Sequence, residues 1–262
     1  MSGVWQWAAA RSIGTSHLKA GSFCQDAWCC AELARDDYSV LAAIVSDGAG
    51  SAPYAATGSK VVCTSLMRSV RSFFAEKKLE DLTEEKIWEW VDLIRDRLQT
   101  FADQKGVRLQ DYAATLVALF ADQTHTVILH IGDGAVVVRK SPESEWEVPS
   151  WPYQGEFAST TTFITDKTEP RLTITPIDEP ISDFAIFSDG IERLVLNYGE
   201  NKAYSPFFDR MIAPLRSLEE TGKSDLLSKA LHDYLSSPKV CERTDDDKTL
   251  ILGVRTGIGS TL

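Results

Sequence analysis

The chain has 262 residues, of which 44% are hydrophobic and 25% are charged, a composition typical of globular proteins and not of disordered, collagen-like or low-complexity chains. Its 27 Lys and Arg residues and 38 Asp and Glu residues give a net charge of −11, which argues against nucleic acid or an anionic membrane surface as a partner. No apolar run approaches the ~18 residues of a membrane-spanning helix and no basic leader opens the chain, so we expect a cytoplasmic protein.

The predicted secondary structure consists of groups of strands separated by helical blocks. In chain order, the predicted elements are strands near 4–13, 26–34 and 39–46, helices over 54–78 and 83–105, strands near 114–121, 125–131, 135–140, 172–175 and 184–188, helices over 205–218 and 223–236, and a strand near 249–255. Because the elements do not alternate strictly between strand and helix, we predict an α+β fold, not a doubly wound parallel sheet.

No feature of the sequence divides the chain into parts. Glycine and proline are spread throughout, without a linker or a repeat, so we expect a single domain over residues 1–262. Separately, we expect the protein to act as a monomer. The five cysteines are odd in number and include no Cys-x-x-Cys pair, so we expect reduced thiols, not disulfides or a zinc site. Residues 141–171 lack a clear period, and we expect them to form a surface excursion near the functional face that influences substrate choice.

Aspartate residues recur at the ends of the predicted strands. Three apolar strands end in the same dipeptide, at Asp47-Gly48, Asp133-Gly134 and Asp189-Gly190. One Asp-Gly is ordinary turn chemistry, but three copies in equivalent places indicate a shared role. The run 245–247 consists of three aspartates and precedes the last strand, so an antiparallel neighbour that ends at Asp189 would bring these acids together.

Hairpin geometry places a further acid at the same end. Asp26 and Asp47 are equally distant from the predicted two-residue turn Asp36-Asp37, so this hairpin sets Asp26 opposite Asp47. The same reasoning about the turn at residues 122–124 brings Thr115 near Ile131 and hence near Asp133, so we expect those two strand ends to meet as well.

Four or five carboxylates at one rim would repel one another unless cations lay between them. Because the donors are oxygens, with no suitably spaced His or Cys, the pattern favours a pair of Mg²⁺ or Mn²⁺ ions over zinc. Gly48 fits such a site, since a residue without a side chain lets its backbone carbonyl approach a metal.

Six short motifs occur in a recognisable order along the chain. They are Cys24-Gln25-Asp26, Asp47-Gly48-Ala49-Gly50, Ala114-Thr115-Leu116, Gly132-Asp133-Gly134, Ser188-Asp189-Gly190 and Asp246-Asp247-Lys248-Thr249. In order and approximate spacing, this set resembles the metal-dependent PP2C-type protein phosphatases, most closely their compact bacterial branch, from about residue 10 to residue 254. The resemblance implies a central β-sandwich of two antiparallel sheets, flanked by helical pairs, with the metal site at one end.

The resemblance also implies a role for each acid. Asp47 would bridge two metal ions beside the Gly48 carbonyl, and Asp189 and Asp246 would bind one of these ions. Asp26 would anchor the site, and Asp133 would bind a weaker third ion. The implied cofactors are two or three Mn²⁺ or Mg²⁺ ions. The implied reaction is hydrolysis of phosphoserine or phosphothreonine by a hydroxide held between the metals, on proteins that a bacterial Ser/Thr kinase has phosphorylated.

Two positions depart from the family pattern. Ala49 stands where many members have a proposed general-acid histidine, and Gly21 stands near the expected place of a phosphate-binding arginine. His17 is the best substitute in the sequence, because imidazole can donate a proton or contact phosphate, whereas Lys19 and Arg11 are weaker candidates. We therefore expect Asp47, Asp189 and His17 to be the catalytic residues.

Two other functions remain open on the sequence alone. The missing histidine and arginine suit a catalytically weak or inactive relative that binds phosphoproteins. A phosphohydrolase that acts on a small phosphorylated metabolite would carry the same acids.

Overall fold

The computed structural model describes residues 5–152 and 161–256. In chain order, the helices and strands are β1 (Trp5–Ser12), α1 (Thr15–Ala20), β2 (Ala27–Arg35), β3 (Tyr38–Ser46), α2 (Ala55–Phe74), η1 (Leu79–Asp81), α3 (Glu84–Lys105), η2 (Leu109–Tyr112), β4 (Leu116–Ala121), β5 (Thr126–Ile131), β6 (Ala135–Arg139), β7 (Glu147–Ser150), β8 (Thr173–Ile177), β9 (Asp183–Phe187), α4 (Asp189–Val195), β10 (Leu196–Asn197), β11 (Lys202–Ala203), α5 (Ser205–Arg216), β12 (Gly222–Lys223), α6 (Asp225–Leu235), α7 (Pro238–Cys241) and β13 (Lys248–Arg255). Among these residues no helix is both long and apolar enough to cross a membrane.

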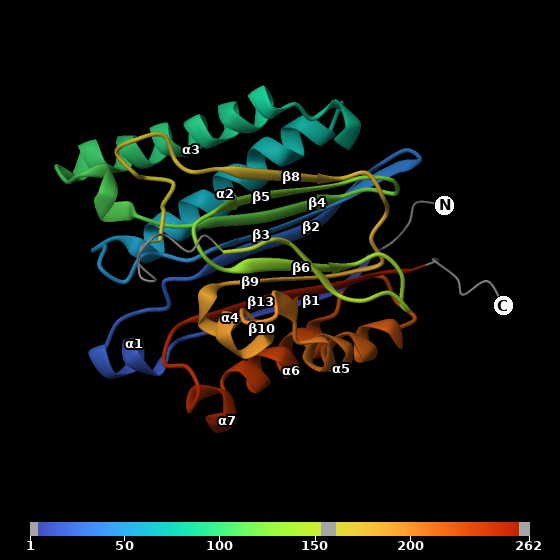
Figure 1. Cartoon of the computed structure of the whole chain (residues 1–262). Coiled ribbons are helices and arrows are strands. Elements are labelled where there is room, and N and C mark those ends of the chain that lie inside the picture. The colour runs from blue at the N-terminus through green and yellow to red at the C-terminus, as the bar shows by residue number, and fades with distance from the viewer. Residues whose placement is uncertain (1–4, 153–160, 257–262) are drawn as a thin grey trace.

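Two β-sheets lie face to face between two layers of helices (Figure 1). One sheet has the strand order β2-β3-β4-β5-β8, and the other has the order β12-β1-β13-β9-β6-β7. The pair α2 and α3 covers the outer face of the first sheet, and α5 and α6 cover the outer face of the second (Figure 1). The predicted α+β sandwich with flanking helical pairs is confirmed, and only the two-residue strand β12 pairs in parallel, with β1, among the described ladders.

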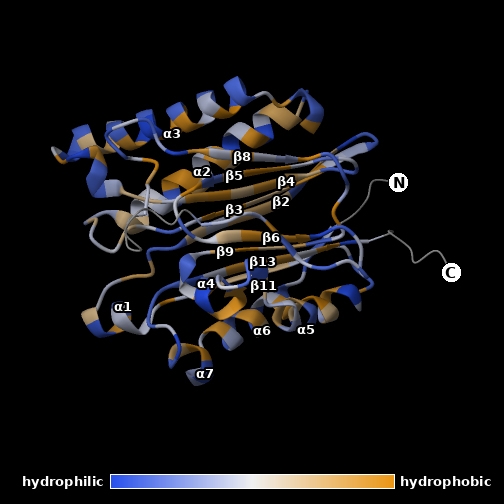
Figure 2. Ribbon diagram, in the orientation of Figure 1, coloured by the Kyte–Doolittle hydropathy of each residue, from blue (hydrophilic) through white to orange (hydrophobic). Residues whose placement is uncertain are grey.

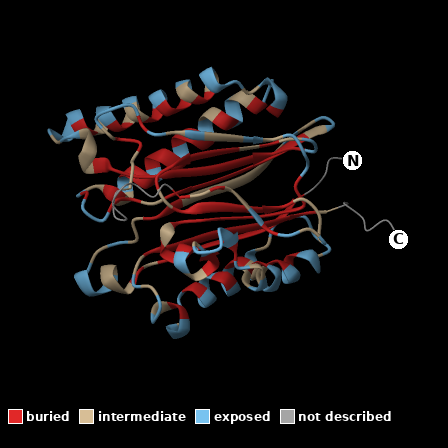
Figure 3. Ribbon diagram, viewed as in Figure 1, coloured by how far each residue is buried: buried red, intermediate tan, exposed pale blue. Residues whose placement is uncertain are grey.

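The central strands are buried on both faces, which explains their almost uninterrupted apolar sequence. Side chains alternate along β3, so that Val40, Ala42 and Ile44 pack beneath α2 and α3. The intervening residues Leu41, Ala43 and Val45 pack against the second sheet. Buried residues accordingly fill the middle of the molecule, while exposed ones follow the outer helices (Figure 3).

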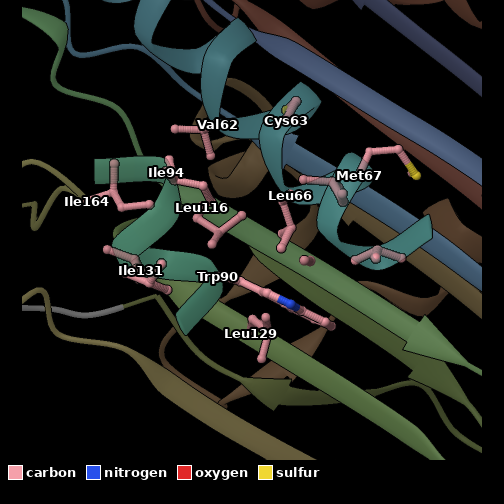
Figure 4. Close-up of a cluster of buried hydrophobic side chains, with 14 of the residues drawn as sticks. Val62, Cys63, Leu66, Met67, Trp90, Ile94, Leu116, Leu129, Ile131 and Ile164 are labelled. Atoms are coloured by element: carbon pink, nitrogen blue, oxygen red, sulfur yellow. The ribbon is translucent and has the colours of Figure 1, made fainter. Parts of the chain in front are cut away.

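The helices are bounded by the signals that the sequence carries. Helix α3 begins after Thr83, whose side chain accepts a hydrogen bond from the backbone N–H of Lys86, and it ends at Gly106 in the left-handed conformation. Most of its hydrophobic residues face inward, Leu93 being an exposed exception, and its charged residues face outward (Figure 2). Trp90 of α3 and Leu66 of α2 meet the β4 and β5 side chains in one cluster (Figure 4).

The structure brings together both pairs of strand ends that the sequence predicts to meet. The β2–β3 hairpin pairs Ala27 with Ser46, so the residues just beyond these ends, Asp26 and Asp47, lie at the same end, as predicted. The prediction that Thr115 comes near Ile131 is also confirmed, because its neighbour Leu116 pairs with Ile131. The side chain of Asp122 accepts hydrogen bonds from the backbone N–H groups of residues 124 and 125, which lengthens the turn to four residues.

Several short elements have no counterpart among the predicted ones. Helix α1 and helix α4 are six and seven residues long, too short to produce a helical stripe in the sequence. Strand β7 lies inside the predicted excursion 141–171 and extends the second sheet next to β6. Part of that excursion, residues 153–160, lies outside the described residues.

Candidate metal centre

A polar cavity of about 490 Å³ opens at the end of the sandwich where β3 and β9 end and β13 begins. The described residues that line it are Ser16, His17, Gln25, Asp47, Gly48, Ala49, Gly50, Ser51, Asp133, Thr161, Phe163, Asp189 and Asp246. Every predicted site residue except Asp26 is on this wall, so the fold brings together positions that are up to 229 residues apart.

Three of the predicted acids form a tight group. One carboxylate oxygen each from Asp47, Asp133 and Asp189 lies within 4.8 Å of the others. Asp47 directly follows β3, Asp133 lies in the turn between β5 and β6, and Asp189 is the first residue of α4. The group therefore draws on strand ends from both sheets.

Asp26 lies beside this group and is buried, with 1% of its surface exposed. Its Oδ2 accepts hydrogen bonds of 2.7 Å from the hydroxyls of Ser188 and Thr249. Among the described residues, no donor meets its Oδ1, nor the Oδ1 atoms of Asp133 and Asp189. Buried carboxylate oxygens without donors are costly, so these three atoms fit a site for a positive ion.

Burial and mutual repulsion perturb the acids strongly. Burial raises the pKa of Asp47 well above its usual value, and the charges of Asp26 and Asp189 raise it further. Burial raises the pKa of Asp189 to about 8, helped by the charge of Asp133. The pKa values of Asp26 and Asp133 are also raised, mainly by burial. Without a cation the cluster therefore retains protons at neutral pH, and a divalent ion would replace them.

Gly48 is required by packing at this site. A Cβ atom on Gly48 would lie 2.6 Å from the backbone carbonyl of Ala55, the first residue of α2. The sequence suggested instead that the small residue lets its own carbonyl approach a metal. The close contact with α2 is a sufficient reason for glycine here, whether or not that carbonyl is a ligand.

The acidic run before β13 has two separate roles. Asp246 lines the cavity, although it does not belong to the tight group of three acids. Asp247 is buried and accepts hydrogen bonds of 2.6 Å from the backbone N–H groups of Gly14 and Gln25. Its Oδ2 also lies 2.9 Å from Nδ1 of His17. The sequence offered no signal for this role, because 233 residues separate Asp247 from Gly14.

The structure ranks the candidates for the missing histidine and arginine. Among the described cavity-lining residues, His17 is the only one with a cationic form, and Ala49 contributes no polar side-chain atom. Arg11 donates a hydrogen bond to the backbone carbonyl of Asp26 and does not line the cavity. Lys19 is exposed and also lies outside the lining, as does Gly21.

Three further residues near the site were not predicted from the sequence. Thr161 donates a 2.5 Å hydrogen bond to Oδ2 of Asp133, and Phe163 lines the cavity beside Ala49. Glu192 accepts a 3.0 Å hydrogen bond from the backbone N–H of Gly134, and burial raises its pKa to about 7. Both Thr161 and Phe163 come from the 141–171 excursion, which agrees with its expected position near the functional face.

The remaining histidines lie away from the cavity lining. His130 is buried and lies 2.8 Å from the hydroxyl of Ser150, and burial lowers its pKa to about 4. His125 belongs to the turn before β5, and His232 is on α6. These positions agree with the structural roles that single, scattered histidines usually have.

Comparison with known proteins is consistent with this geometry. A family model described as protein phosphatase 2C matches residues 13–236. A relative from Escherichia coli (strain K12), named serine/threonine-protein phosphatase 3, is 36% identical over 255 residues, which cover 95% of this chain and 98% of that protein.

Solved structures agree in fold. The protein PppA, described as a key regulatory component of T6SS in Pseudomonas aeruginosa, has a TM-score of 0.62 at 16% identity, over 97% of this chain and 99% of that one. A serine/threonine phosphatase from Staphylococcus aureus has a TM-score of 0.60 at 17% identity, over 96% and 95% of the two chains.

Proposed function

This chain belongs to the protein phosphatase 2C family, and we propose that it is a metal-dependent serine/threonine protein phosphatase whose site is the acid-lined cavity. The observation that carries the proposal is the group of half-buried carboxylates beside the buried Asp26, with raised pKa values and with buried oxygens that no described donor meets. Repulsion among these acids destabilises the metal-free fold, and a bound cation would relieve that repulsion.

The donor set indicates which ions the site would hold. Asp47, Asp189 and Asp246, with the Gly48 carbonyl, would hold two ions, with Asp26 as their buried anchor. Asp133 would contribute to a third, weaker ion. Carboxylate and carbonyl oxygens suit Mg²⁺ or Mn²⁺. When bound, these ions would supply a water of lowered pKa as nucleophile and neutralise negative charge on the phosphate oxygens.

The chain's own residues would perform the remaining steps. Asp26, fixed by Ser188 and Thr249, would keep Asp47 in place at the end of β3. His17, held beside Asp247, would place its ring at the cavity and donate a proton to the departing serine or threonine oxygen. Phe163 and Ala49 would exclude water from one side of the cavity.

The wider setting follows from the same features. We infer that the substrates are proteins phosphorylated by a bacterial Ser/Thr kinase, and that the enzyme acts as a monomer. Its five unpaired cysteines suit a reducing compartment, so we place it in the cytoplasm. The first and last strands of the sandwich, β1 and β13, pair along their whole lengths, which supports one phosphatase domain over residues 1–262.

The decisive experiment compares the wild type with Asp189→Ala, using a phosphothreonine peptide and an aryl phosphate, with Mn²⁺ or with a chelator. We expect turnover that requires metal and that is lost in Asp189→Ala. Asp37→Ala is the matched control, because Asp37 is an exposed acid in the β2–β3 turn and should leave turnover unchanged.

Other outcomes would support the two other functions. Phosphopeptide binding without turnover in folded, metal-loaded wild type would indicate a phosphoprotein-binding relative. A much higher kcat/KM on small phosphoesters than on phosphopeptides would indicate a small-molecule phosphohydrolase.

A further inference from the structure

Two large apolar side chains are exposed on the segment of residues 14–25, which contributes Ser16, His17 and Gln25 to the cavity wall. Leu18 is 58% exposed and Phe23 is 84% exposed, the highest value among the exposed large hydrophobic residues that the structure describes. Leu18 directly follows His17, and Phe23 is two residues before Gln25. Because His17 and Gln25 both line the cavity, each apolar side chain lies within two residues of its wall.

The 14–25 segment is hydrogen-bonded at both of its ends to the acidic run that precedes β13. The Asp247 carboxylate accepts hydrogen bonds from the backbone N–H of Gly14 with one oxygen and from that of Gln25 with the other. Near the first end, both the backbone N–H and the hydroxyl of Ser16 donate to the carbonyl of Asp245. The segment is therefore fixed relative to Asp246, which lies between these two partners and lines the cavity.

Hydrogen bonds within the 14–25 segment also favour a single backbone conformation. Helix α1 ends at Gly21, whose backbone N–H donates to the carbonyl of Leu18, and Ser22 donates to the carbonyl of His17. Figure 1 shows α1 standing out from the sandwich, at the end away from the two termini. An ordered segment presents Leu18 and Phe23 in defined places, so a ligand would not have to order them on binding.

The charge of the segment suits an anionic partner. No Asp or Glu occurs between Ser12 and Gln25, and the charged or ionisable groups of that stretch besides Cys24 are His17 and Lys19. In a chain with a net charge of −11, this segment therefore adds no carboxylate of its own to the entrance; the acids next to it belong to the run at residues 245–247.

We propose that Leu18 and Phe23 form a docking surface for an apolar side chain next to the phosphorylated residue of the protein substrate. The proposal rests on the proposed function, since it names what the same site selects. An extended peptide advances ~3.3 Å per residue, so a side chain one to three positions from the phosphorylated residue reaches the 14–25 segment while the phosphate is in the cavity. Exposed apolar surface that is covered on binding then adds to the affinity for such peptides.

The test uses phosphothreonine peptides of alanine and serine in which one leucine is moved from three residues before to three residues after the phosphothreonine. We expect the wild type to prefer leucine at one or two of these positions by about tenfold in kcat/KM over the leucine-free peptide, as covering part of one large apolar side chain allows. In Leu18→Ser/Phe23→Ser we expect that preference to disappear.

Leu226→Ser is the matched control, because Leu226 is 76% exposed on α6, on another part of the surface. This variant should retain both the leucine preference and the activity towards an aryl phosphate. Fluorescence anisotropy with the same labelled peptides measures the preference as binding, whether or not turnover occurs.

The outcomes separate this proposal from the proposed function. No leucine preference in the wild type, or a preference that survives in the double variant, would overturn the docking surface while leaving the phosphatase intact. Absence of turnover on every substrate would instead contradict the proposed function, and the anisotropy series would still decide whether Leu18 and Phe23 select the peptide.

Discussion

The strongest quantitative prediction concerns the stability of the metal-free protein between pH 5 and pH 8. Burial raises the pKa of Asp189 to about 8 in the folded chain, against about 3.9 for an aspartate in an unfolded chain. The folded state therefore binds this proton more tightly than the unfolded state does. Stability from this group is present at pH 5 and is lost as the pH rises towards 8.

The magnitude follows from the size of the shift. Each pH unit over which the folded state holds one extra proton changes the free energy of unfolding by about 1.4 kcal/mol. Over this interval Asp189 alone accounts for a loss of about 3 to 4 kcal/mol, which corresponds to roughly 10 °C in Tm for a domain of this size. Added Mn²⁺ should restore stability at pH 8, because the ion replaces the proton.

Thermal unfolding in chelator, followed by circular dichroism at several pH values, measures this loss. Asp189→Asn keeps the shape of the side chain but removes the titration, so its Tm should fall much less over the same interval. Asp37→Asn should behave like the wild type, since Asp37 is exposed. Comparison of variants cancels groups that titrate in all of them, such as His130. Equal pH dependence in the wild type and Asp189→Asn would refute the reasoning.

Three further predictions test other parts of the structure. Gly190→Ala places a Cβ 1.8 Å from the backbone carbonyl oxygen of Asp247, so it should lower the free energy of unfolding by at least about 2 kcal/mol and weaken metal binding. Gly199→Ala is the control, because its Cβ meets only a side-chain oxygen at 3.5 Å. Equal Tm values for the two variants would contradict the Gly190 contact. His17→Gln should lower kcat/KM about a hundredfold on a phosphothreonine peptide but far less on an aryl phosphate, because the aryl leaving group departs without a proton. Equal losses on the two substrates would exclude proton donation by His17. Leu66→Ala, at a residue with 0% exposure, should cost about 2–5 kcal/mol in urea unfolding, whereas Leu93→Ala, at 58% exposure, should cost less than about 0.5 kcal/mol.

The parts of the site that depend on local geometry were predictable from the sequence. The positions of Asp26 and Asp47 follow from one hairpin, whose two-residue turn determines the register of every pair along it. The Asp189 end of β9 and the start of β13 lie together because an antiparallel neighbour reverses direction. In each case, once the strands are recognised, few other pairings of their ends are possible.

The parts that depend on distant contacts were not predictable. Asp246 and Asp247 are adjacent and chemically identical, yet one lines the cavity and the other holds the backbone of the 14–25 segment. Thr161 reaches Asp133 from a stretch without periodicity, so its partner could not be chosen from sequence spacing. The sequence places Thr115 near Ile131 but does not determine which residues pair, because the length of the β4–β5 turn depends on hydrogen bonds to the Asp122 side chain.

Because the acids come from both sheets, an ion bound by them would link the two sheets of the molecule. Asp26 and Asp47 flank strands of one sheet, Asp189 and Asp246 flank strands of the other, and Asp133 lies on the crossing between them. By thermodynamic reciprocity, any change that stabilises the contact between the two sheets would strengthen ion binding, and ion binding would stabilise that contact by the same free energy. We therefore expect amino-acid changes between the sheets, such as at the buried Phe184, to alter metal affinity without contact to the ion. Selection for activity would then act on the residues packed between the two sheets as well as on the acids themselves.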